Sequence, residues 1–132
     1  MRIYLDACVV IYIVERHPEF FTRINEYLSR NELDIVVSGL TRLECLVQPL
    51  RLEDMVRLRQ FELFFNAPDL TVVPFSEHVF DRAATLRARH RLKTPDALHL
   101  AAAIEAGCDE FWTNDHRLDT AASGYLRVLA LQ

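Results

Sequence analysis

Four acidic side chains occupy positions from which they could bind a cation together: Asp6, Glu44, Asp96 and Asp115. Carboxylates supply the oxygen ligands that hard divalent cations prefer. Without a cation such a cluster is unfavourable, because two unit charges about 4 Å apart repel by about 1 kcal/mol in water and about 4 kcal/mol at an effective dielectric constant of 20. We therefore expect the four carboxylates to raise one another's pKa in the metal-free protein.

The elements that would position these acids alternate between strands and helices. Short apolar runs rich in β-branched or aromatic residues predict strands at 2–5, 34–37, 70–73, 110–113 and 125–131. Apolar residues at three- and four-residue spacing predict helices at 18–30, 41–47, 52–65, 77–91 and 95–106. The Gln48-Pro49 pair indicates a break between two of these helices. Such alternation predicts an α/β sandwich with a mainly parallel central sheet.

The acids lie close to the ends of the predicted strands. In open parallel sheets the functional crevice lies beyond the carboxyl ends of the strands. Asp6 directly follows the first strand, and Asp115 follows Thr113 by two residues. Glu44 lies near the start of the helix after the second strand, and Asp96 lies in the first turn of a later helix. We therefore expect the four side chains to converge at one edge of the sheet.

Two of the acids also have a structural explanation at helix starts. Thr41-Arg-Leu-Glu44 matches the capping box, in which the glutamate accepts a hydrogen bond from the N-cap backbone. Asp96 lies in a helical turn that Thr94 would cap and Pro95 would start, where the helix dipole favours a negative charge. Both explanations stay open, and the capping box does not exclude a metal contact through the second glutamate oxygen.

The other two acids differ in how well a structural role explains them. Asp6 lies between apolar residues, where an unpaired carboxylate would be costly to bury, and this favours a functional role. Asp115 and Asp119 could instead be turn residues or helix caps. Four independent caps would not be expected at corresponding ends of alternating elements, so the joint pattern favours a shared site. Whether Asp119 contributes is left open.

Composition limits the class of protein. The 132 residues, 51% of them hydrophobic, suit one domain spanning 1–132. A net charge of −4 does not suit a sequence-tolerant nucleic-acid coat, so any nucleic acid would bind locally. The longest apolar run, Ala7–Val14, is too short to cross a bilayer, and no signal-peptide cleavage site is evident. The cysteines Cys8, Cys45 and Cys108 form no CxxC pair, which predicts buried thiols in a reducing cytoplasm.

Four segments resemble the successive acidic motifs of PIN-domain nucleases: Tyr4-Leu-Asp6, Thr41-Arg-Leu-Glu44, Thr94 to Ala103, and Thr113-Asn-Asp115. Within that family, the size and the Asp-Ala-Leu-His-Leu-Ala block most resemble VapC-type ribonuclease toxins of bacterial toxin–antitoxin pairs. The resemblance implies a three-layer α/β/α fold. It also implies that Asp6, Glu44, Asp96 and Asp115 bind Mg²⁺, or Mn²⁺ in its place, with the Thr113 hydroxyl supporting the site. One departure is Ala7-Cys8, where many relatives carry a hydroxyl or amide residue.

The activity implied by the resemblance is endonucleolytic cleavage of RNA. A metal-bound hydroxide would attack the phosphorus in line, leaving a 5′-phosphate and a free 3′-hydroxyl. The candidate RNA contacts are basic residues that precede Asp96: Arg82, Arg87, Arg89, His90, Arg91 and Lys93. Of these, Arg87, Arg89, Arg91 and Lys93 form the predicted RNA-binding set. A solvated helix face explains the same residues equally well.

The resemblance also implies protein partners, namely a cognate antitoxin and a second copy of the chain. A hydrophobic groove between the helices around Phe20–Leu28 and Leu52–Phe65 would take a segment of the antitoxin. Phe61, Phe64 and Phe65 are candidates for its lining. Ordinary core packing is the favoured explanation for these aromatic residues, because a stripe at helical spacing usually faces inward.

Other functions compete with this interpretation. His99 and His116 flank the acids and could act as base and acid in metal-independent cleavage through the 2′-hydroxyl, although a histidine among Leu and Ala is more often a packing residue. A phosphoacceptor or phosphatase site would need paired acids or a second aspartate two residues after Asp6, where Cys8 lies. A catalytically inactive PIN-like binding or regulatory module also remains open.

Overall fold

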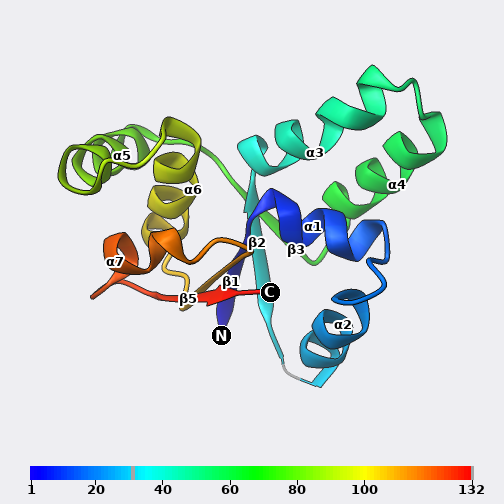
Figure 1. Ribbon diagram of the computed structural model, residues 1–132, viewed down its shortest axis with the longest axis horizontal. Coiled ribbons are helices and arrows are strands. Elements are labelled where there is room, and N and C mark those ends of the chain that lie inside the picture. The colour runs from blue at the N-terminus through cyan, green and yellow to red at the C-terminus, as the bar shows by residue number, and fades with distance from the viewer. Residues whose placement is uncertain (31, 132) are drawn as a thin grey trace.

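The computed structural model describes residues 1–30 and 32–131, and its centre is a parallel sheet (Figure 1). The strands are β1 (Arg2–Leu5), β2 (Asp34–Ser38), β3 (Leu70–Val73), β4 (Glu110–Thr113) and β5 (Arg127–Ala130). Their order is β3-β2-β1-β4-β5, and each neighbouring pair is parallel. The prediction of a parallel α/β sheet is therefore confirmed.

Helices cover both faces of this sheet (Figure 1). They are α1 (Ala7–Val14), α2 (Phe21–Arg30), α3 (Gly39–Arg51), α4 (Met55–Phe65), α5 (Glu77–His90), α6 (Thr94–Glu105), α7 (Asp119–Ala122) and the short 3₁₀ helix η1 (His116–Leu118). Side chains alternate along a strand, so Ile3 and Leu5 pack with α1 to α4 while Tyr4 packs with α5 to α7. The three-layer α/β/α arrangement is confirmed. In the described part of the chain, no helix is long and apolar enough to span a membrane.

Helix α1 is an element that the sequence pattern does not predict. Its eight residues are all apolar and rich in β-branched types, so they lack the periodicity of a one-sided helix. The helix forms between the sheet and α2, α3 and α4, and it is covered on several sides. Asp6 caps it by accepting a hydrogen bond from the Ala7 backbone nitrogen.

The boundary between α3 and α4 corrects the predicted break at Gln48-Pro49. Helix α3 continues through Pro49 to Arg51. The turn instead contains Glu53, with a positive φ of 52°, and Asp54, whose side chain caps α4. Smaller corrections concern α2, which begins three residues later than predicted, and β5, which is confined to Arg127–Ala130.

The strand order reverses direction between β1 and β4. The chain proceeds from β1 outward to β2 and β3, then returns to β4 on the other side of β1. In parallel sheets, ligands bind beyond the carboxyl ends of the strands at such a switch point. The residues that follow β1 and β4 are Asp6 and the segment Asn114-Asp115, so the fold places two of the predicted acids there.

Candidate metal centre

Asp6 is held in place by the strand next to it. Its backbone nitrogen donates to Trp112 O on β4 at 2.9 Å. Its carboxylate oxygens accept hydrogen bonds from the Ala7 nitrogen at 2.8 Å and from Thr113 Oγ1 at 2.9 Å. Thr113 is the last residue of β4 and is fully buried. The Thr113 hydroxyl therefore lies where it can orient the Asp6 carboxylate.

Glu44 reaches the same place from the second turn of α3. The predicted Thr41/Glu44 capping box is wrong, because Ser38 is the N-cap and Thr41 completes the box with it. The Glu44 side chain is instead directed to His99, with Oε1 at 2.5 Å from Nε2. That nitrogen also lies 3.7 Å from Asp6 Oδ1. Asp6, Glu44 and His99 each offer one potential ligand atom, and these three atoms lie within 4.8 Å of one another.

Asp96 lies in the first turn of α6, but its helix is not capped as predicted. Lys93 is the N-cap and makes no side-chain capping bond, while Thr94 is already helical. Burial raises the pKa of the Asp96 carboxyl, the charges of Asp6 and Asp115 raise it further, and His99 and Arg117 lower it. Asp96 therefore shares an electrostatic environment with Asp6 and Asp115, and its raised pKa agrees with the expected mutual repulsion.

Asp115 is near the other acids but is also engaged locally. It is the N-cap of η1, and its Oδ1 accepts from the Arg117 nitrogen at 2.9 Å. The Arg117 guanidinium adds contacts of 2.6 to 2.9 Å to both carboxylate oxygens. These hydrogen bonds lower the pKa of Asp115. The prediction of a raised pKa is therefore wrong for this residue, and a capping role is present. Asp119 begins α7 and is exposed.

The sequence places His99 beside the acids but does not predict its hydrogen bond with Glu44. It is 2% exposed, and both ring nitrogens have partners, Tyr4 at Nδ1 and Glu44 at Nε2. A general base must reach the substrate proton directly or through one water, which this burial does not favour. The signal available in the sequence is its spacing of three residues from Asp96, which places both on one face of α6.

The thiol of Cys8 lies beside this site. Its pKa is raised to about 12, chiefly by burial and then by the charge of Asp6, while hydrogen bonds with the Asn114 backbone and the Thr113 side chain oppose the rise. Cys8 is partly buried, whereas Cys45 and Cys108 are buried, and all three are free thiols. A high pKa makes the Cys8 thiol a weak nucleophile. At the Ala7-Cys8 departure, Ala7 donates to Asp6 only through its backbone nitrogen, and Thr113 is a side-chain donor to Asp6.

The family model of the PIN domain matches residues 3–124. This span is most of the chain and includes all four acids. The chain belongs to the PIN domain family. No curated protein sequence matches it.

Solved structures share the fold of this PIN domain at low sequence identity. The crystal structure of VapBC2 from Rickettsia felis, bound to a DNA fragment from its promoter, gives a TM-score of 0.79 at 17% identity and covers 100% of both chains. DNA-bound VapBC from Salmonella typhimurium gives 0.76 at 19%, covering 98% of both chains. Mycobacterium tuberculosis VapC20, described as a sarcin-ricin loop cleaving toxin, gives 0.74 at 13% and covers 94% of this chain and 96% of its own.

The donor atoms of this PIN domain suit a hard divalent cation. Four carboxylates supply oxygen ligands, which Mg²⁺ and Mn²⁺ prefer. Asp6 and Glu44 present oxygens around one small space beside His99. Among the described residues, no side chain donates a hydrogen bond to Asp96, so its oxygens are available to a cation or its waters. The residues present therefore fit a divalent metal ion.

The predicted RNA-binding residues lie just before the Asp96 helix. Arg87 and Arg89 are in the last turn of α5, Arg91 is its left-handed C-cap, and Lys93 is the N-cap of α6. All four are exposed. Arg87 also donates from Nε to Leu92 O at 2.9 Å, which fixes the link between the helices. By contrast, Arg82 pairs with Glu105. Exposure is compatible with RNA contact and with a solvated helix face.

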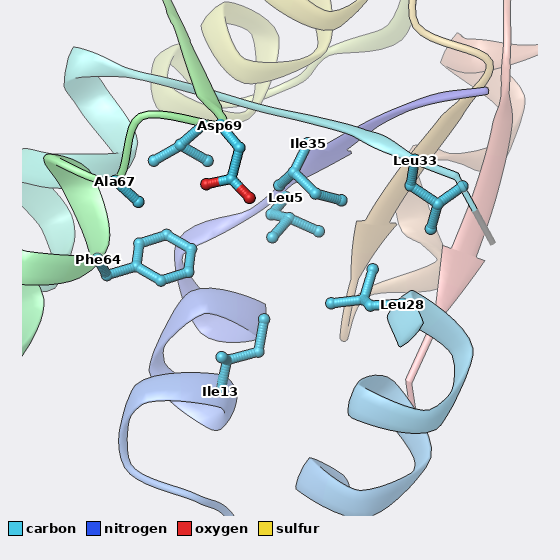
Figure 2. A pocket seen from close by; sticks show the side chains of 9 residues that line it. Leu5, Ile13, Leu28, Leu33, Ile35, Phe64, Ala67 and Asp69 are labelled. Carbon is cyan, nitrogen blue, oxygen red and sulfur yellow. The ribbon is translucent and has the colours of Figure 1, made fainter. Parts of the chain in front are cut away.

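The three phenylalanines of α4 divide between the core and a surface cavity. Phe61 and Phe65 are buried in the core, as the packing explanation predicts. Phe64 lines an apolar cavity of about 160 Å³ (Figure 2). The other lining residues come from the sheet, α1, α2 and the segments before β2 and β3: Leu5, Ile13, Leu28, Leu33, Ile35, Ala67, Asp69 and Leu70. The cavity thus lies between the helices from which the sequence predicts a groove.

Proposed function

We propose that this PIN domain is a metal-dependent endoribonuclease and the toxin of a type II toxin–antitoxin pair. The observation that carries the proposal is that Asp6 and Glu44 present oxygens within 4.8 Å of one another at the switch point of the sheet. The electrostatic effect of Asp6 and Asp115 on Asp96 supports a site that all four acids share. Likeness in fold to a toxin described as cleaving the sarcin-ricin loop supports a nucleic acid as the substrate class, and we take it to be RNA. The three free cysteines support a cytoplasmic location.

The acids have distinct tasks in this mechanism. Asp6 and Glu44 would hold Mg²⁺ or Mn²⁺ directly, and Asp96 and Asp115 would complete the charge around it or around its waters. When bound, the metal supplies a water of lowered pKa and neutralises charge that develops on the phosphate. Thr113 keeps the Asp6 oxygen oriented. Arg87, Arg89, Arg91 and Lys93 would contact RNA phosphates, so binding should weaken as salt concentration rises.

An antitoxin segment would occupy the apolar cavity beside α1, α2 and α4. The cavity supplies apolar contact area, and Asp69 directs a carboxylate toward it (Figure 2). A segment with an apolar residue for the cavity and a Lys or Arg for Asp69 would fit both features. Calorimetry with the antitoxin paired with this chain should show Asp69→Lys weakening binding by about tenfold or more, and Asp81→Lys on α5 leaving it unchanged. Equal binding by both variants would exclude this use of the cavity.

A second copy of the chain would cover the outer surface of the α3–α4 hairpin. Large apolar side chains are exposed there: Leu43, Val47, Leu50, Leu52, Met55, Val56 and Leu63. Contiguous exposed apolar residues of this kind mark protein interfaces. Sedimentation of the purified protein should give a dimer that Val56→Glu dissociates; a monomeric wild type would contradict the homodimer.

The test of the nuclease is cleavage of structured RNAs by partner-free protein in Mg²⁺ or Mn²⁺. Asp6→Asn keeps an oxygen acceptor for Thr113 but loses the charge. We expect cuts bearing 5′-phosphates, their loss in EDTA, and a decrease of about a hundredfold or more in rate with Asp6→Asn, since several kcal/mol of metal stabilisation are removed. Intact RNA in all conditions would favour an inactive binding module. Cutting that resists EDTA would favour the histidine mechanism.

A further inference from the structure

A buried tyrosine hydroxyl lies directly behind the acid cluster. Tyr4 is in the middle strand, is fully buried, and directs its hydroxyl toward α3 and α6. The hydroxyl lies 2.8 Å from Ser38 Oγ, 3.3 Å from Thr41 Oγ1 and 2.8 Å from His99 Nδ1. Buried polar groups require such partners, so the four side chains form one connected network.

The direction of the His99 ring follows from its two partners. A carboxylate is only an acceptor, so Nε2 must carry the hydrogen that faces Glu44. A phenol both donates and accepts, so Tyr4 satisfies Nδ1 whether or not that nitrogen carries a hydrogen. The ring is therefore fixed with a donor aimed at Glu44. This geometry also leaves no free nitrogen on His99 for a metal ion.

Ring packing alone does not account for the Tyr4 hydroxyl. The Tyr4 ring stacks on Phe111 with centroids 5.2 Å apart and an angle of 11° between planes. A phenylalanine would make that contact without burying a polar group. The hydroxyl instead links the start of α3, where Ser38 and Thr41 form the capping box, to His99 on α6. It thereby connects the helices that carry Glu44 and Asp96.

We propose that Tyr4 and His99 are positioning residues that hold the Glu44 carboxylate beside Asp6 for metal binding. His99 acts on Glu44 through the 2.5 Å contact, and Tyr4 acts on His99 from the opposite side of the ring. Hydrogen-bond partners behind metal ligands typically change metal affinity by 10- to 100-fold when removed. This inference rests on the proposed metal-dependent function.

The test measures Mn²⁺ binding by electron paramagnetic resonance in the wild type and in Tyr4→Phe. We expect Tyr4→Phe to weaken Mn²⁺ affinity about tenfold. Tyr125→Phe, which removes an exposed hydroxyl far along the chain, is the matched control and should leave affinity unchanged. If Tyr4 acts through Glu44, Tyr4→Phe should cause no further loss in a Glu44→Gln background, because coupled residues are not additive.

The outcomes separate this inference from the function on which it rests. A wild type without Mn²⁺ binding overturns both. Mn²⁺ binding that is equal in wild type and Tyr4→Phe, or weakened equally with and without Glu44, overturns the positioning role alone. Should Tyr4→Phe fail to fold on thermal melting, His99→Gln, which keeps an amide donor, should bind Mn²⁺ more tightly than His99→Leu. Equal affinities of those two variants would then overturn the proposal.

Discussion

The two sides of the acid cluster are held in different ways. Asp6 and Glu44 contact Thr113 and His99, which are 0% and 2% exposed and belong to the core. Asp115 is held by Arg117, whose side chain is 79% exposed and lies two residues away. Buried core side chains therefore fix the positions of Asp6 and Glu44, whereas an exposed local contact holds Asp115.

This difference predicts where metal binding rearranges the protein. The hydrogen bonds of Thr113 and His99 can persist when a cation binds the remaining oxygen lone pairs of Asp6 and Glu44. The Arg117 guanidinium already occupies both oxygens of Asp115, so a cation must share or replace it. An ion pair to a fully exposed guanidinium is screened by solvent and contributes little, which makes that exchange easy.

The largest loss of stability is expected for a change in Thr113, the buried residue that contacts Asp6. Thr113→Val keeps the shape of the side chain but removes the donor to Asp6 and the acceptor for the Asp115 nitrogen. Leaving such groups unsatisfied should lower the free energy of unfolding by about 1–3 kcal/mol in urea titrations. Thr85→Val on the exposed face of α5 is the control, with an expected change of about 0.5 kcal/mol or less. Equal losses would remove the distinction between the two regions.

The pH dependence of stability should show the repulsion between Asp96 and the neighbouring acids. A carboxyl with a raised folded-state pKa binds more protons in the native than in the unfolded state. The stability of the metal-free protein should therefore fall as the pH rises from the unfolded pKa through the folded pKa of Asp96. Asp96→Asn should remove that fall and stabilise the metal-free protein at neutral pH.

The same variant should have the opposite effect when metal is present. In saturating Mn²⁺ the wild type gains binding free energy that Asp96→Asn partly loses. Melting temperatures measured with and without Mn²⁺ should therefore change their order between the two proteins. If Asp96→Asn is destabilising in both conditions, the carboxylate is a structural cap of α6 and not part of a cation site.

Arg117→Gln should give the smallest change in stability. Because this guanidinium is exposed and its ion pair is screened by solvent, its removal should leave the free energy of unfolding close to that of the wild type. The lowered pKa of Asp115 should rise toward its ordinary value in a carboxyl NMR titration, because its main hydrogen bond is lost. Since a lowered folded-state pKa adds stability above the unfolded pKa and loses it as the pH falls, this variant should be less sensitive to acid.

Arg117→Gln should also tighten Mn²⁺ binding if the guanidinium competes with the cation. Arg59→Gln, which breaks an exposed pair with Glu62 on α4, is the control. Weaker Mn²⁺ binding by Arg117→Gln would mean that the guanidinium supports the site, and the two sides of the cluster would then be alike.

The sequence predicts the parts of this molecule that depend on local patterns. Alternating apolar runs give the parallel sheet, and the positions after its strands give Asp6 and Asp115. Contacts between distant segments have no local pattern, so the link from Tyr4 to His99, 95 residues apart, is not predictable in this way. Helix α1 is missed for a related reason, because a run buried on several sides lacks periodicity.

The sequence does not predict the helix caps correctly, for a third reason. Several residues near each helix start have suitable side chains, and tertiary contacts decide among them. Thr41 could cap α3 by its type, yet Ser38 at the end of β2 does so. The Glu44 side chain is then available to His99. The wrong capping prediction for Glu44 therefore leaves its predicted place in the acid cluster unchanged.

The hydrogen bond between Asp6 and Thr113 joins residues 107 positions apart. During translation, Asp6 leaves the ribosome long before the strand that orients it has been made. The nascent chain therefore carries dispersed acids until β4 is added beside β1, so Asp6 gains its Thr113 donor only after β4 has been made.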